Sequence, residues 1–196
     1  MATTRPNKNI SDFKSKLIGG GARPNLFEVE LTTLPAGIAW PSDNFRYMCK
    51  AAQLPASVIA NIVIPFRGRI FKVAGDRTID PWTVTVINDE DFLLRTAFEN
   101  WTQQIADLTT NLGATDPSAY MTNAKVFQLG RGSSKASTDS SGDSNVVLKE
   151  YEFVDIFPTS VSAIDLSYDT GDTIEEFTVE FQVQSLNLAG AGSPNG

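Results

Sequence analysis

The chain has 196 residues, 41% of them hydrophobic, and a formal net charge of −7. This length predicts one domain with a buried core, and the acidic balance argues against a protein that grips nucleic acid through phosphate contacts. The sequence has no histidine and a single cysteine, Cys49, which removes the commonest general base and metal ligand and excludes an intrachain disulfide. No run of about 18 apolar residues occurs, so we expect neither a membrane anchor nor a signal peptide.

The chain begins with a polar segment, residues 1–21, that ends in three glycines and predicts a flexible arm. Within this arm we expect a short helix from Ser11 to Leu17, capped by the Ser11 hydroxyl. The first strand is predicted over residues 25–31, because apolar side chains there alternate with Glu28 and Glu30.

A long hairpin is predicted next. Residues 32–44 carry the prolines and glycine of a loop, and a second strand is expected from Phe45 to Ala51. The stretch Val58–Phe66 is apolar on both faces apart from Asn61. A strand without alternation is buried on both sides, either by its own fold or by a partner chain. We expect residues 45–74 to form a hairpin that reaches beyond the body of the subunit.

One clear strand and one strong helix follow the hairpin. Residues 82–87 alternate apolar and polar side chains and predict a strand, after which Asn88 or Asp89 is expected to cap the helix. The apolar stripe of this helix has spacings of four and three residues and consists of Leu94, Phe98, Trp101, Ile105 and Leu108. Such a helix is expected to lie over a sheet and close one side of the core.

The second half of the chain contains a long polar segment and then more strands. Residues 109–145 are rich in Gly, Ser, Thr, Asp and Asn and predict a mobile loop, interrupted by a short strand near Lys125–Leu129. Further strands are predicted over residues 146–153, 160–166 and 177–184. The glycine-rich tail, residues 187–196, is expected to be disordered, which leaves one domain over residues 22–186.

These elements predict a mainly β fold. Seven or eight strands and one main helix favour a β-sandwich or partly closed barrel with one flanking α-helix. The alternating faces of the strands are amphipathic, so one face is expected in the core and the other in contact with water. Cys49 is expected to be a small, half-buried strand residue.

No group of residues predicts a catalytic, metal or cofactor site. The stretches 139–143 and 169–172 carry spaced aspartates but lack the terminal glutamate and full ligand spacing of a calcium loop, so we interpret them as solvated turns. Asp76 and Arg77 are interpreted as a turn with a structural or inter-subunit ion pair. We expect no enzyme activity, although a hydrolase that uses two carboxylates stays open in a chain with 23 acidic residues.

Separated segments of the sequence resemble bacteriophage tail tube proteins, most closely the tube subunit of contractile, T-even-like tails. The resemblance is carried in family order by Ala22–Glu30, Cys49–Ala56 and Arg69–Phe92. It implies a β-sandwich whose inner sheets join into one continuous barrel in a hexameric ring, and rings that stack into a tube inside a contractile sheath. It also implies sheath, baseplate and tape-measure partners, phage DNA that passes through without specific binding, and a place in the virion tail after assembly in the bacterial host cytoplasm.

Within that architecture two sets of residues become candidate assembly sites. The candidates for ring stacking are Val58, Ile62, Ile64 and Phe66. The candidates for lining the lumen are Glu28, Glu30, Thr178, Glu180 and Gln182. Acidic side chains on a channel wall would repel phosphates and let DNA slide.

Three alternatives stay open at this point. The same fold serves baseplate tube-initiator or hub rings and the tubes of phage-derived contractile injection systems. A carbohydrate-binding β-sandwich module predicts a monomer with exposed aromatic side chains, and the hydrolase predicts activity lost with one acid pair. Rings or tubes that form with rising concentration would separate the assembly proteins from the last two.

Overall fold

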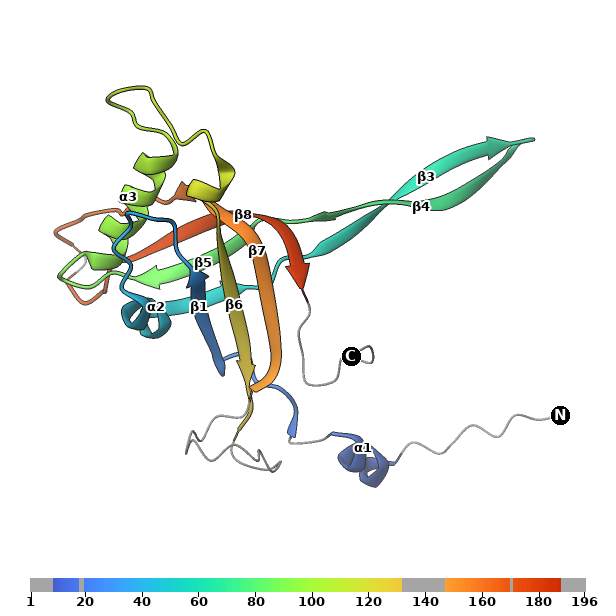
Figure 1. Ribbon diagram of the computed structural model, residues 1–196. Helices are drawn as coiled ribbons and strands as arrows, with labels where there is room; N and C mark the ends of the chain where they lie inside the picture. Colours follow the sequence, from blue (N-terminus) through green and yellow to red (C-terminus); the bar gives the residue numbers. More distant parts are fainter. Residues whose placement is uncertain (1–8, 18–19, 132–146, 170, 188–196) are drawn as a thin grey trace.

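The computed structural model describes residues 9–17, 20–131, 147–169 and 171–187. Most of the predicted C-terminal tail lies outside this part, as do residues 1–8 and 18–19 of the predicted arm and residues 132–145 of the predicted loop. One six-stranded sheet forms the body, in the order β1-β6-β7-β8-β5-β2, and a two-stranded hairpin projects from it (Figure 1). The strands are β1 (Phe27–Thr33), β2 (Cys49–Gln53), β3 (Ser57–Phe66), β4 (Arg69–Ile79), β5 (Trp82–Ile87), β6 (Thr122–Leu129), β7 (Val147–Val161) and β8 (Glu176–Asn187). The helices are α1 (Ile10–Lys16), α2 (Ser42–Met48) and α3 (Leu93–Ile105), with a short 3₁₀ turn at Pro117–Ala119.

The edge strands β1 and β2 approach each other, so the sheet nearly closes and the predicted mainly β, partly closed barrel is confirmed. Strand β7 divides this sheet into two walls, because residues 147–156 pair with β6 while residues 152–161 pair with β8. The strand bends at Asp155, which has a φ of 54° and whose backbone N–H donates to the Asn123 side chain over 3.0 Å. We call β1, β6 and the start of β7 the first wall, and the end of β7 with β8, β5 and β2 the second wall. The two walls cross in Figure 1.

The two strands predicted over residues 146–153 and 160–166 are therefore one strand, which ends earlier, at Val161. Beyond that point the Ser162 hydroxyl accepts the backbone N–H of Thr178 over 2.9 Å. A side chain thus takes the place of a backbone acceptor, and the ladder between β7 and β8 stops there.

The core lies between the walls and α3. Trp82 of β5 is fully buried and stacks on Phe153 and Phe181, with ring centroids 4.8 and 5.1 Å away. From α3, Phe98 meets Phe177 edge to face at 6.0 Å. The inward residues of β5 and β8 are the ones that the period-two pattern predicted, since burial alternates along both strands.

Helix α3 confirms the predicted apolar stripe except for its last residue, Leu108. Leu94, Phe98 and Trp101 are buried, whereas Leu108 is 86% exposed because the helix ends at Ile105. The predicted cap is also wrong. The N-cap residue is Phe92, with a φ of 52° and no side-chain cap bond, while the Asn88 amide donates to the Glu175 carboxylate over 3.0 Å. Asn88 therefore joins the loop before α3 to the start of β8.

Two short helices also differ from the prediction. The residues expected to begin the second strand form α2, because Phe45 enters the core edge-on against Trp40 (5.1 Å) and its N–H donates to the Pro41 carbonyl over 3.0 Å. In α1 the cap is Asn9 rather than Ser11, since the Asn9 side chain accepts the Asp12 N–H over 2.8 Å.

The protruding hairpin consists of β3 and β4, joined at Arg67 and Gly68, whose φ angles are 47° and 80°. Two consecutive residues with positive φ form the turn that best matches the twist of a two-residue hairpin. The prediction of a hairpin beyond the body is right, but its extent is corrected to residues 57–79. Residues 49–53 are β2, which belongs to the main sheet because it pairs with β5.

Candidate assembly surfaces

The hairpin carries a continuous apolar face that none of the described residues covers. Directly opposite residues share a face, and the pairs are Ile62 with Val73, Ile64 with Phe71 and Phe66 with Arg69. We call Ile62, Ile64, Phe66, Phe71 and Val73 the hairpin apolar face; their exposed fractions are 54, 45, 66, 63 and 40%. The described part of the subunit's own fold therefore does not bury this apolar strand, which favours the second predicted explanation, burial by a partner chain.

Three of the four stacking candidates, Ile62, Ile64 and Phe66, lie on this face. Val58 lies near the base of the hairpin instead, opposite Thr78, and is 50% exposed. Sequence periodicity did not identify Phe71 and Val73, because only the register of β3 with β4 places them beside the candidates. An isolated two-stranded hairpin is marginally stable in water, and exposed apolar patches of this kind mark interaction sites.

The hairpin is also basic. Its charged residues are Arg67, Arg69, Lys72, Asp76 and Arg77, and among the described residues none of the four cations forms a salt bridge. The Arg67 guanidinium lies 5.5 Å from the Phe66 ring centroid, and Arg77 Nε donates to Ser57 Oγ over 2.5 Å. The cations at the tip and along the edge are therefore available to a partner.

Asp76 and Arg77 do not form the predicted turn, because both lie within β4 beside an irregularity in the ladder between Ile59 and Asn61. A Cβ at Gly75 would lie 3.1 Å from the Ala60 carbonyl oxygen. Glycine lets the two backbones approach closely there, and the extra residue in β4 increases the local twist of the hairpin.

The lumen candidates separate into two groups. Glu28 and Glu30 point outward from β1, and both form salt bridges with Arg46 of α2, the Glu30 oxygen at 3.5 Å from Arg46 Nη2. On the neighbouring strands Lys125 Nζ lies 2.8 Å from the Glu150 carboxylate, whose hydrogen bond raises the pKa of Lys125. The outer face of the first wall therefore carries acids with cationic partners.

The other group lies on the outer face of the second wall. Thr178 and Glu180 of β8 stand opposite Thr85 and Thr83 of β5, and Gln182 follows on the same face. Glu180 forms no salt bridge with any residue that the structure describes. Since β6 and β7 separate β1 from β8 in the sheet, the structure does not bring the two groups together.

Within the described ranges, no group of three or more His, Cys, Asp or Glu side chains is arranged to hold a metal ion. The one thiol, Cys49, is buried, and burial raises its pKa to about 12. Asp169 and Asp172 lie in exposed turns, as predicted, and residues 139–143 lie outside the described part. The described helices include none with the length and apolar character needed to span a membrane.

The described residues form a nearly closed sheet from which an exposed apolar hairpin protrudes, an architecture that presents a large surface for contact with another chain. The model of the phage tail tube protein family matches residues 22–188. The chain therefore belongs to the phage tail tube protein family, and the resemblance found in its sequence motifs is confirmed.

Individual relatives agree with this assignment. The chain is 37% identical to the tail tube protein gp19 of Enterobacteria phage T4 over 161 residues, which cover 82% of this chain and 88% of that protein. A tail tube protein of Serratia phage KSP90 is 21% identical and covers 88% of this chain and 93% of its own length.

Solved structures share the fold at low sequence identity. A chain from the baseplate of the anti-feeding prophage superposes with a TM-score of 0.61 at 11% identity, over 87% of this chain and 96% of that one. A chain from the sheath-tube complex of an extracellular contractile injection system superposes with a TM-score of 0.50 at 10% identity, over 94% and 99% of the two chains.

Proposed function

We propose that this protein is the major tail tube subunit, which forms hexameric rings that stack into the channel for DNA ejection. The observation that carries the proposal is the exposed hairpin apolar face on a member of the tail tube family. The sheath, baseplate and tape-measure proteins are its proposed partners, and assembly takes place in the host cytoplasm. The protein acts by assembly, without enzymatic activity or a cofactor.

Stacking follows from the exposure of the hairpin. Every residue of β3 is exposed, so a free subunit presents both apolar side chains and a two-stranded edge to water. A neighbouring ring that covers the hairpin removes these apolar side chains and this edge from water, and the burial of apolar surface stabilises the stacked rings. Ile62, Ile64 and Phe66 are the proposed centre of the stacking contact, with Val58 at its base.

The channel lining is proposed to be polar, with no unpaired cation among the described residues of either candidate face. Thr178, Glu180 and Gln182 supply a largely uncharged face with one unpaired acid, over which DNA slides without being held. Glu28 and Glu30 are the second proposed lining, and there Arg46 offsets part of the acidic charge.

Thiol labelling of assembled tubes decides which wall faces the lumen. Single cysteines would replace Glu28 or Glu180, and the buried native Cys49 leaves the background unreactive. A lumen cysteine reacts with a small maleimide and not with a bulky polymer maleimide, because only the small reagent diffuses along the channel. A cysteine that reacts equally with both reagents in intact tubes rules its wall out as the lining.

Electron microscopy of the purified protein across a concentration series, alone and with a matching baseplate, tests the proposed function as a whole. Hollow tubes built from six-fold rings are the expected product. A baseplate initiator, the main alternative, would form single rings that do not grow. Monomers that persist even with the baseplate would overturn the proposal and favour a binding module.

A further inference from the structure

The loop from β7 to β8 forms a second exposed surface, which the function proposed above leaves unexplained. We call residues 162–169 and 171–175 the acidic loop; its charged residues are Asp165, Asp169, Asp172 and Glu175, and it has no lysine or arginine. It is apolar as well, because Leu166, Tyr168 and Ile174 have exposed fractions of 80, 109 and 71%. A pocket of about 650 Å³ opens between its two limbs, lined among others by Ile164, Leu166 and Ile174.

Most of the loop's acids have no cationic partner in the described part of the chain. Asp165, Asp169 and Asp172 form no salt bridge with the residues that the structure describes. Glu175 differs, since its carboxylate accepts a bond from the Asn88 amide and its carbonyl accepts the Asn88 N–H over 2.9 Å. These bonds fix the base of the loop and leave its outer acids free.

The hairpin has the complementary character. It presents the apolar face described above together with Arg67, Arg69, Lys72 and Arg77, which have no salt-bridge partner among the described residues. One exposed surface of the chain is therefore apolar and basic, and another is apolar and acidic. Opposite charges around an apolar contact steer two surfaces together and fix their register.

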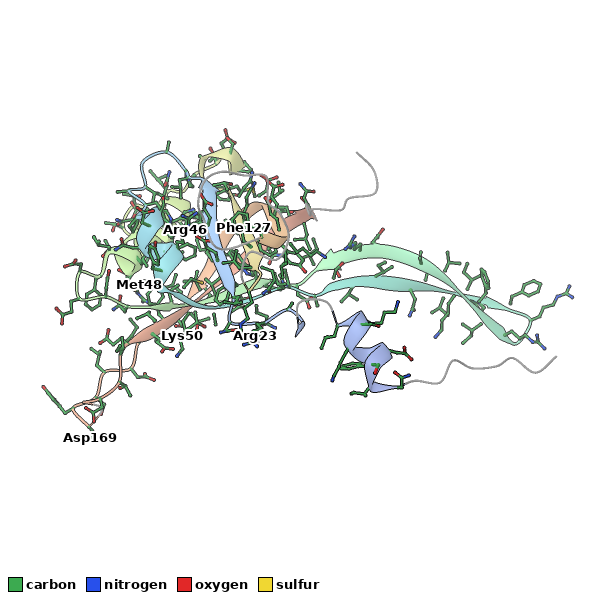
Figure 2. All side chains as sticks on the ribbon, turned by 90° about the horizontal axis from the view of Figure 1, so that it is seen from below. Arg23, Arg46, Met48, Lys50, Phe127 and Asp169 are labelled. Carbon is green, nitrogen blue, oxygen red and sulfur yellow. The ribbon has the colours of Figure 1, made fainter. Side chains whose placement is uncertain are left out.

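The two surfaces lie at opposite ends of the subunit. Strand β4 leads directly into β5 at Trp82, whereas the acidic loop enters β8 at Glu176, opposite Ile87 at the other end of β5. Figure 2 shows the same separation, with the hairpin on one side of the barrel and Asp169 on the other. The hairpin therefore cannot reach its own acidic loop. Contact between different surfaces of two copies is head-to-tail and propagates without closing when the copies are displaced along an axis.

We infer that the hairpin of one subunit docks on the acidic loop of a second copy in the next ring, with its cations beside Asp165, Asp169 and Asp172. This contact rests on the proposed function and names the receiving surface that the stacking hypothesis lacked. It makes ring stacking polar in direction, because the hairpin end of one ring meets the acidic-loop end of the next.

A charge exchange in the full-length protein tests the contact. One variant carries Arg69→Glu and Lys72→Glu, a second carries Asp165→Lys and Asp169→Lys, and a third carries all four substitutions. All of these side chains are exposed, so we expect each variant to fold with an unchanged thermal midpoint. We expect the first two to raise the concentration needed for tube growth at least tenfold, and the third to return it to within about threefold of the wild-type value.

A control variant, Leu112→Lys with Thr115→Lys, adds positive charge to an exposed loop away from both surfaces and is expected to assemble normally. Hairpin substitutions that block stacking while the loop substitutions leave it unchanged would overturn the inferred contact and leave the proposed function intact. Failure of the fourfold variant to recover, when both twofold variants are folded, would also overturn it. If the wild-type protein forms neither rings nor tubes even with a baseplate, the proposed function itself fails.

Discussion

The sharpest consequence of the hairpin geometry concerns Ile64, at the centre of the hairpin apolar face. Replacing it with aspartate, Ile64→Asp, changes little in the free subunit, because the side chain is 45% exposed and lies on a hairpin outside the barrel core. Surface substitutions of this kind alter the free energy of unfolding by about 0.5 kcal/mol or less. The barrel should therefore keep its thermal midpoint and its circular dichroism spectrum.

The same substitution should be severe in the stacked tube. Covering the exposed part of an isoleucine contributes about 1 kcal/mol, and this term is lost. A carboxylate enclosed in the apolar contact costs several kcal/mol more. A combined loss of about 4 kcal/mol per contact weakens stacking roughly 1000-fold.

Sedimentation of tubes across a concentration series, followed by negative-stain microscopy, measures this loss. The critical concentration of the Ile64→Asp protein should rise about 1000-fold, while that of Ile64→Leu stays close to the wild-type value. Leu112→Asp is the matched control, since Leu112 is 72% exposed and lies outside the hairpin. Folded Ile64→Asp protein that forms tubes at the wild-type critical concentration would refute the assignment of the hairpin to stacking.

Three further substitutions or conditions test other parts of the structure. Trp82→Ala removes a fully buried side chain from the stacked core and should lower the free energy of unfolding by about 3–5 kcal/mol in urea titrations; a loss below about 1 kcal/mol would contradict its central place in the core. Gly75→Val should distort the hairpin, since a Cβ there meets the Ala60 carbonyl oxygen at 3.1 Å, and should impair tube growth while the thermal midpoint of the barrel stays constant. The Cys49 thiol should resist thiol reagents at pH 8 until the chain is unfolded. Because folding raises its pKa from 9.0 to about 12, the free energy of unfolding should fall as pH increases across that interval. The difference in unfolding free energy between the wild type and Cys49→Ala isolates this effect, and a difference that does not change between pH 9 and 12 would contradict it.

Sequence patterns predicted the interior of the strands well and the ends of elements poorly. The alternation around Trp82 and Phe181 identified buried faces, since a period-two pattern reports which side of a sheet meets the core. Phe45 was assigned to a strand, because an apolar residue in a short segment fits a strand or a helical turn equally well. Asn88 is a residue type that often caps helices, yet its side chain donates to the carboxylate of Glu175, which lies 87 residues away in sequence.

For the assembly surfaces, too, the sequence predicted one part and the tertiary structure decided the other. The apolar run from Val58 to Phe66 was visible in the sequence, and so was the conclusion that something must cover it. The sequence could not decide whether that cover belonged to the same subunit, because an apolar strand in a core and one at an interface have the same composition. The register of β3 with β4 then added Phe71 and Val73 to the face.

The amino-acid sequence by itself determined the mainly β class, the family and the presence of an unusual apolar hairpin, since these depend on local periodicity and short motifs. Only the tertiary structure decided that Glu28 and Glu180 stand on different walls, that Arg46 pairs with the first group, and that the basic hairpin and the acidic loop lie at opposite ends of β5. The physical reason is that charge pairing and the direction of assembly depend on distances between residues far apart in the chain. Strand order and the bend of β7 set those distances, and no local pattern in the sequence encodes them.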